Sequence, residues 1–143
     1  MKKFIAILAG VLAFAAVASA QPRAIGLRAG YAPVGEISYQ HGLGTNFVEV
    51  DFGGYYGLHV VGVYDFVFAN ANIFNFYVGP GALLGLYDAA DSWKFDAGIV
   101  GQLGVEAAIP SVPINISLDW RPTIISATGT HWDGIALGIR YRF

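Results

Sequence analysis

The sequence predicts an all-β protein, an up-and-down antiparallel transmembrane β-barrel of eight strands. Three observations support this prediction. The chain is 55% hydrophobic and 15% aromatic but only 13% charged. After residue 21, apolar residues alternate with polar ones or glycine in nearly every segment, which is the period of a strand. That part of the chain contains no apolar run of about 18 residues, which a membrane-spanning helix needs.

The first twenty residues have the pattern of a cleaved secretory signal peptide. Lys2 and Lys3 precede an apolar run, and small residues at Ala18 and Ala20 stand before a predicted cut at Gln21. A buried N-terminal helix is the alternative. The absence of cysteine excludes a lipid-anchored lipoprotein and a disulfide framework. We therefore expect a signal peptide at 1–20 and one barrel domain at 21–143.

The first four predicted strands alternate in the expected way. They are AIGLRAGY (24–31), EISYQHGL (36–43), FVEVDFGG (47–54) and HVVGVYDFVF (59–68). His41 falls on the apolar face of the second strand and interrupts its pattern. We expect turns at 33–35 and 44–46, and a loop at 55–58. Asn70, Asn72 and Asn75 predict the next turn, because asparagine tolerates a left-handed backbone.

The last four predicted strands follow the same rule. They are FYVGPGALLGLY (76–87), FDAGIVGQLGVEAAI (95–109), INISLDWR (114–121) and GIALGIRYRF (134–143). Pro80 predicts a bulge in the fifth strand, because proline removes a donor from the ladder. Pro122 ends the seventh strand. We expect a polar loop at 88–94, a turn at 110–113, and the longest loop at 123–133.

A soluble lipocalin-like or sandwich fold would turn the apolar faces inward instead. Two features favour the membrane barrel. The polar faces carry glycine and charge, which suits a narrow filled lumen, and aromatic residues lie near the strand ends, as in interfacial girdles. Ten shorter strands would also fit the pattern.

Charged residues fall on the polar faces of the predicted strands, and we expect them to form a network of salt bridges that fills the lumen. A selective pore or a proton relay is the alternative interpretation of the same set. The predicted network contains Arg28, Glu49, Asp51, Asp65, Glu106, Asp119, Arg121, Arg140 and Arg142. Glu36 and Asp96 share the same faces.

The last strand carries Ile135, Leu137, Ile139 and Tyr141 and ends on Phe143. It resembles the C-terminal signal of Gram-negative outer-membrane barrels. The stretch 101–122 is similar to the penultimate hairpin of families described as outer membrane protein β-barrel domains, and the whole chain resembles eight-stranded OmpA- and OmpX-type barrels.

This resemblance implies insertion in the bacterial outer membrane, both termini in the periplasm and four outer loops. It implies that Tyr141 and Phe143 recruit the barrel-assembly machinery, and that outer-membrane lipid and lipopolysaccharide surround the protein.

Other functions have weaker support in the sequence. Removal of Lys2 and Lys3 leaves six basic residues against ten acidic ones, which argues against nucleic acid. The glycines at 79–85 lack the spacing of a nucleotide-binding loop. His41, His59 and His131 show no close ligand spacing. We therefore expect no catalytic, cofactor or metal site.

Two further functions stay open. One is a narrow channel for small solutes or ions. The other is a lipid A-modifying acyl enzyme that uses Ser92, Asp91 and either His59 or His131, although the chain lacks the H-x-S motif of lipid A deacylases and its predicted lumen is charged. The aromatic loop residues Tyr55, Tyr56, Trp93 and Trp132 anchor in the interface or contact an unknown partner.

Overall fold

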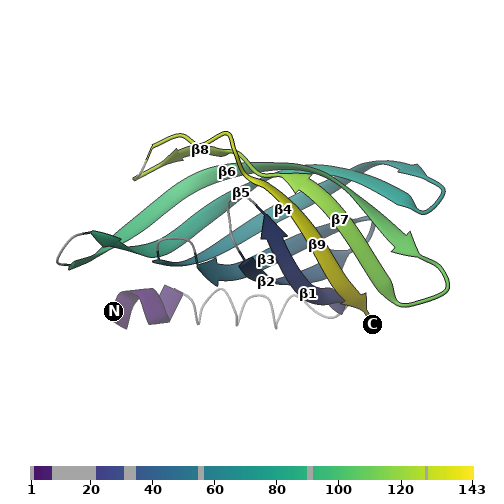
Figure 1. The fold of residues 1–143 in the computed structure, drawn as a ribbon, viewed down its shortest axis with the longest axis horizontal. Coiled ribbons are helices and arrows are strands. Elements are labelled where there is room, and N and C mark those ends of the chain that lie inside the picture. Colours follow the sequence, from purple (N-terminus) through teal and green to yellow (C-terminus); the bar gives the residue numbers. More distant parts are fainter. Residues whose placement is uncertain (1, 8–21, 31–34, 55–56, 90–91, 128) are drawn as a thin grey trace.

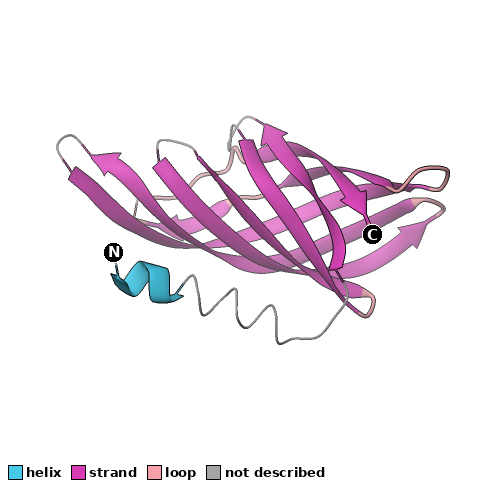
Figure 2. Cartoon of the chain, turned by 90° about the horizontal axis from the view of Figure 1, so that it is seen from below, coloured by secondary structure: helices cyan, strands magenta, loops and turns pink. Residues whose placement is uncertain are grey.

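The computed structural model describes residues 2–7, 22–30, 35–54, 57–89, 92–127 and 129–143. Residues 2–7 form a short helix, and the rest of the described chain is almost entirely strand (Figures 1 and 2). None of the helical residues described belongs to a helix long and apolar enough to cross a membrane. The strands are β1 (Pro22–Gly30), β2 (Gly35–Leu43), β3 (Asn46–Gly54), β4 (Gly57–Ala71), β5 (Phe74–Ala89), β6 (Ser92–Ile109), β7 (Ile114–Trp120), β8 (Thr123–Ser126) and β9 (Ile135–Arg142).

The strands form a closed antiparallel barrel, which confirms the predicted all-β, up-and-down architecture. Their order is β5-β4-β3-β2-β1-β9-β7-β6, and pairing between β5 and β6 closes the circle. From β1 to β7 each strand pairs with the next one in the chain, β7 also pairs with β9, and β1 pairs with β9 to join the two ends. Every hairpin is therefore local, and the closed circle leaves the barrel wall without a long open edge.

Two short strands, β7 and β8, together occupy the seventh position in the barrel wall. β7 pairs with the end of β6, and β8 pairs with Gly98–Val100 of the same strand. Pro122 separates them because it has no N–H to donate to the ladder. Its carbonyl still accepts a hydrogen bond from the Gly101 amide at 3.0 Å. The prediction of a loop throughout 123–133 was therefore wrong, since its β-branched start resumes the pairing.

Several predicted loops are shorter in the structure. Gly57 and Leu58 belong to β4, so the predicted loop at 55–58 is shorter, and its residues 55 and 56 lie outside the described part. β5 extends to Ala89 and β6 begins at Ser92, which replaces most of the polar loop predicted at 88–94. These segments continue the ladder because each pairs with an opposite strand of matching length. The turn predicted at 33–35 lies outside the described residues except for Gly35.

The turn between β4 and β5 is also tighter than predicted. Asn70 and Asn75 are paired strand residues, and only Asn72 has a left-handed backbone, with φ of 58°. The predicted bulge at Pro80 was wrong. Pro80 stays in register opposite Gly101, and the irregularity of the β4–β5 ladder lies between Val67 and Ala69.

The two faces of the wall have opposite chemistry. Along β9, exposed Ile135, Leu137 and Ile139 alternate with buried Ala136, Gly138 and Arg140. β2 and β7 show the same alternation, with buried polar side chains and exposed apolar ones. A small apolar cluster of Val61, Val63 and Val100, packed against Leu83, also lies among the buried residues. The barrel is thus polar inside and apolar outside over most of its wall.

His41 is an exception to the alternation of β2, as the sequence pattern indicated. It shares the face of Tyr39, whose hydroxyl lies 2.9 Å from His41 Nδ1, and it is nearly buried. It stands where the β1–β2 register shifts, between Pro22 and Ala24. The register shift therefore falls at the position where the strand alternation is interrupted.

We predict that Gly79→Ala destabilises the barrel by about 1–3 kcal/mol, because an added Cβ overlaps the carbonyl oxygen of Tyr64 on β4 and forces the strands apart. Gly62→Ala is the matched control, since a Cβ there meets nothing within 4 Å. Urea unfolding of the folded protein in detergent, followed by tryptophan fluorescence, measures both. Equal effects of the two substitutions would contradict the close approach.

Candidate functional site: a buried ionic network

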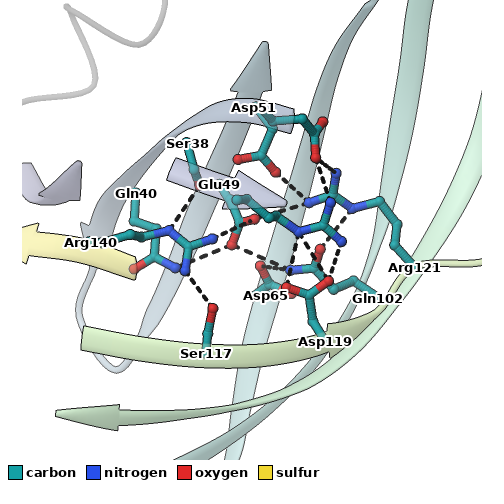
Figure 3. Close-up of polar contacts among 12 residues, drawn as sticks. Ser38, Gln40, Glu49, Asp51, Asp65, Gln102, Ser117, Asp119, Arg121 and Arg140 are labelled. Carbon is teal, nitrogen blue, oxygen red and sulfur yellow. Dashed lines mark hydrogen bonds and ion pairs between the residues drawn. The ribbon is translucent and has the colours of Figure 1, made fainter. Parts of the chain in front are cut away.

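The structure buries eight of the nine residues of the predicted network. Arg121 is the most exposed of these eight, at 7%, and the others are 2% exposed or less. They come from β1, β3, β4, β6, β7, β9 and the residue after β7, and Figure 3 shows six of them converging: Glu49, Asp51, Asp65, Asp119, Arg121 and Arg140. Because the inward face of every strand repeats at every second residue, the closed barrel collects their side chains in one place.

Arg121 is the centre of the network. Its Nη2 contacts Glu49 Oε1 at 3.0 Å and also pairs with Asp51. Nη1 lies 3.5 Å from Glu36 Oε1, and Nε donates to Gln102 Oε1 at 2.8 Å. One planar guanidinium thus joins four side chains from β2, β3 and β6.

The local backbone fixes the position of Arg121. A residue before proline is restricted to extended conformations, and Pro122 follows it directly. The Arg121 amide donates to the carbonyl of Gly134, the residue before β9, at 2.6 Å. The interruption between β7 and β8 therefore lies at the residue whose guanidinium enters the lumen.

Arg28 forms the second group of contacts. Its Nη1 lies 2.5 Å from Glu36 Oε1, and its Nε donates to Asp119 Oδ1 at 3.1 Å. Glu36 is the direct cross-strand partner of Arg28 in the β1–β2 ladder. His59 Nε2 lies 2.9 Å from the other oxygen of Glu36. Glu36 therefore bridges Arg28, Arg121 and His59.

Arg140 forms the third group. Nη2 lies 3.1 Å from Glu49 Oε1, while Nε donates to Ser38 Oγ at 2.8 Å and Nη1 to Ser117 Oγ at 2.7 Å. A Cβ at Gly138 would crowd both Ser117 Oγ and the Arg140 guanidinium. Small residues on neighbouring strands thus make room for the long arginine.

Arg23 belongs to the site although the sequence pattern did not place it there. It pairs with Glu106 and hydrogen-bonds Gln40, and its guanidinium carbon lies 4.1 Å from the centre of the Phe47 ring. Simple alternation along β1 puts residue 23 on the face opposite to Arg28. The bulge between Pro22 and Ala24 inserts one residue and turns its side chain inward. The sequence of β1 itself gives no signal for this bulge, and the one irregularity near it is His41 on the paired strand.

Arg142 lies apart from the other network residues. Its Nη2 donates to the carbonyls of Ile109, at 2.6 Å, and Val112, at 3.1 Å, in the turn between β6 and β7. Asp96 is half-buried and accepts from the Ala127 amide at 2.9 Å. Both residues share the inward face of their strands. Arg142 bonds to the β6–β7 connection and Asp96 to the residue after β8, at the two ends of the barrel.

The predicted assembly-signal residues lie on the outer face. Tyr141 is 51% and Phe143 61% exposed, and their ring centres are 6.1 Å apart. Their side chains are available to lipid or to a partner along the outside of β9.

The residues of the alternative acyl-transfer site are dispersed or undescribed. His59 points to Glu36, Ser92 is exposed at the start of β6, and the His131 backbone pairs with Thr123. Asp91 lies outside the described residues. Among the described residues, no group of three His, Asp or Glu side chains is arranged to hold a metal ion.

The geometry and charge of the network give it one clear physical consequence. Arginine side chains extend from three adjacent positions of the wall, on β1, β9 and the end of β7, and meet carboxylates and amides inside the narrow barrel, so they occupy the bore with paired charge (Figure 3). The fold and the site together define the class of the molecule as an eight-stranded antiparallel β-barrel with an ionic interior. No family model, no curated protein and no solved structure matches this chain.

We predict that Arg121→Met destabilises the barrel by about 3–5 kcal/mol, because it leaves the buried carboxylates of Glu36, Glu49 and Asp51 short of a partner. Exposed Lys94→Met is the control and should change the free energy of unfolding by less than about 0.5 kcal/mol. Urea unfolding in detergent micelles measures both variants. A change for Arg121→Met as small as the control's would show that the network does not stabilise the barrel.

Proposed function

We propose that this protein is an integral barrel of the bacterial outer membrane with a structural or surface-interaction role, and that its ionic network closes the lumen. The observation that carries the proposal is the inverted distribution of polarity. Charged side chains such as Arg28 and Glu49 are 0% exposed, whereas large apolar side chains such as Leu27 are 66% exposed. A barrel surrounded by hydrocarbon requires this arrangement, and one surrounded by water does not.

The basic residues support the same proposal. After the predicted signal peptide, the chain has five arginines and one lysine. Four arginines contact network side chains and the fifth, Arg142, donates to a turn, so Lys94 near the tip of the β5–β6 hairpin is the exposed cation. The middle of the outer wall is therefore free of arginine and lysine, whose presence there would be costly in lipid.

Aromatic side chains gather toward both ends of the strands. Near the β4–β5 turn, the rings of Phe68 and Phe76 lie 6.4 Å apart, and farther from this turn on β4 those of Tyr64 and Phe66 lie 4.7 Å apart. Near the opposite end, Trp120 stacks on Trp132, and Trp120 Nε1 donates to the Trp132 carbonyl at 2.8 Å. Two such belts suit the two interfaces of a membrane, where aromatic rings lie at the level of the headgroups.

The same aromatics favour anchoring over partner recognition. Trp120 satisfies its indole N–H within the chain and holds the loop that contains Trp132 against the wall. Trp93 is 61% exposed on the outer face of β6. Tyr55 and Tyr56 lie outside the described residues. The proposed contacts of this end are outer-membrane lipid and lipopolysaccharide.

We predict that Leu137→Arg destabilises the barrel in lipid vesicles by about 2–4 kcal/mol, because an exposed side chain at the middle of β9 would move a charge into hydrocarbon. Val112→Arg is the control, since Val112 is exposed in the β6–β7 turn and should accept a charge with little effect. Urea unfolding in phosphatidylcholine vesicles measures the difference. An equally small effect of both, or a mature chain that stays folded and monomeric without detergent, would contradict the membrane proposal.

We predict that the protein shows no steady single-channel current in a planar bilayer, because Arg121, Arg28 and Arg140 occupy the bore together with their partners. Insertion is verified in the same preparation by the slower migration of the heated protein in detergent gels. A stable current from inserted protein would favour the narrow channel and contradict a closed lumen.

A further inference from the structure

The buried network contains more carboxylates than guanidiniums. The carboxylates are those of Glu36, Glu49, Asp51, Asp65, Glu106 and Asp119, all 3% exposed or less. The guanidiniums in contact with network side chains are those of Arg23, Arg28, Arg121 and Arg140. His59, paired with Glu36, supplies at most one more positive charge. With every carboxylate ionised, the interior of the described barrel therefore carries a net negative charge.

Asp65 is the buried carboxylate of the network that has no arginine within ion-pair distance. Each of the other five carboxylates has an arginine within ion-pair distance. Asp65 is 0% exposed, and its Oδ2 accepts from Gln102 Nε2 at 3.0 Å. Its Oδ1 is buried and has no hydrogen-bond partner within the described chain. Figure 3 shows the Asp65 carboxyl beside the Gln102 amide.

The guanidiniums near Asp65 are directed at other groups. Arg121, after β7, uses Nε on Gln102 Oε1 and Nη2 on Glu49 and Asp51. Arg140 of β9 is held by Glu49, Ser38 and Ser117. Neither arginine has a contact with Asp65 among the described atoms.

The other groups that face Asp65 add negative charge or none. Glu49 of β3 approaches the same Gln102 amide, at 3.4 Å from Oε2, so two carboxyls converge on one N–H₂ group. Asp119 of β7 adds a further negative charge, while the charge of Arg121 acts in the opposite direction although Arg121 makes no contact with Asp65 among the described atoms. Tyr77 of β5 is fully buried, and its hydroxyl has no partner in the described structure.

We propose that Asp65 is a proton-binding site of the folded barrel, and that its carboxyl takes a proton from solvent on folding and keeps it at neutral pH. A buried carboxylate without a cation is far more costly than a buried neutral carboxyl group, whose hydroxyl is at most one unsatisfied donor. The proton cancels the unpaired charge and removes repulsion from Glu49. This inference concerns the closed barrel itself and does not depend on the membrane proposal.

The proton makes folding dependent on pH in a defined direction. The folded state binds one proton more than the unfolded chain, where aspartate ionises near pH 4, so stability contributed by Asp65 falls as pH rises. In this range the equilibrium constant for unfolding rises by about tenfold per pH unit relative to a variant that lacks the group. The paired carboxylates have the opposite tendency at acid pH, and the comparison with a variant separates the two.

The test compares Asp65→Asn with the wild-type protein by urea unfolding in detergent from pH 5 to 9. Asparagine imitates the neutral carboxyl group, so we expect a folded variant whose stability relative to the wild type increases with pH. Glu106→Gln is the matched control, because Glu106 is equally buried but pairs with Arg23. We expect it to lose stability at every pH and to keep the pH dependence of the wild type.

Infrared spectroscopy tests the protonated state directly, even for variants that fold poorly. The wild-type barrel at pH 7 should show the carbonyl band of a protonated carboxyl group, which disappears in Asp65→Asn and remains in Glu106→Gln. Absence of this band from the wild type would overturn the proposal. Stabilisation by sodium or potassium chloride but not by choline chloride at equal ionic strength, without the band, would show that a monovalent cation occupies the site instead and would also overturn it.

Discussion

The pairing of charges inside a closed wall is the constraint on which the rest of the structure depends. Charged side chains placed in a narrow lumen lose most of their hydration, so each must find a partner or be neutralised. Arg121 meets this requirement for Glu49 and Asp51 at once, and Arg28 does so for Asp119. The partners come from strands far apart in the chain, so these contacts form only when β1 joins β9 and the barrel is closed.

The irregular parts of the wall serve this pairing. Pro122, which follows Arg121, separates β7 from β8. The bulge near Ala24 turns the Arg23 side chain inward toward Glu106. Both irregularities weaken the backbone ladder locally, and each accompanies an inward-facing arginine, Arg121 buried and Arg23 half-buried. A wall of perfectly regular strands would place Arg23 on the outer face, among apolar side chains. We infer that the backbone hydrogen-bond ladder is interrupted at the positions where an arginine side chain must point into the interior.

The sequence predicts the barrel well, because alternation with period two directly encodes which side chains share a face. It places Arg28, Asp65 and Arg140 inside without any knowledge of the neighbouring strands, and all three are buried. Strand ends are predicted less well, since whether Thr123 or Ser92 continues a ladder depends on the length of the opposite strand. Arg23 is missed because a bulge shifts the period by one residue, and the only irregularity near it in the sequence is His41 on the paired strand.

The chemical state of the interior is a further step that alternation does not encode. Periodicity assigns Asp51 and Asp65 to the same face and treats them alike. Their difference arises from the third dimension, because the barrel directs Arg121 to Asp51 and the Gln102 amide to Asp65. The carboxyl group that has no arginine within ion-pair distance is thus confined to one position. The interior can then be filled with charged side chains while its most isolated carboxyl group stays neutral. Closure of the barrel is thereby coupled to the uptake of a proton.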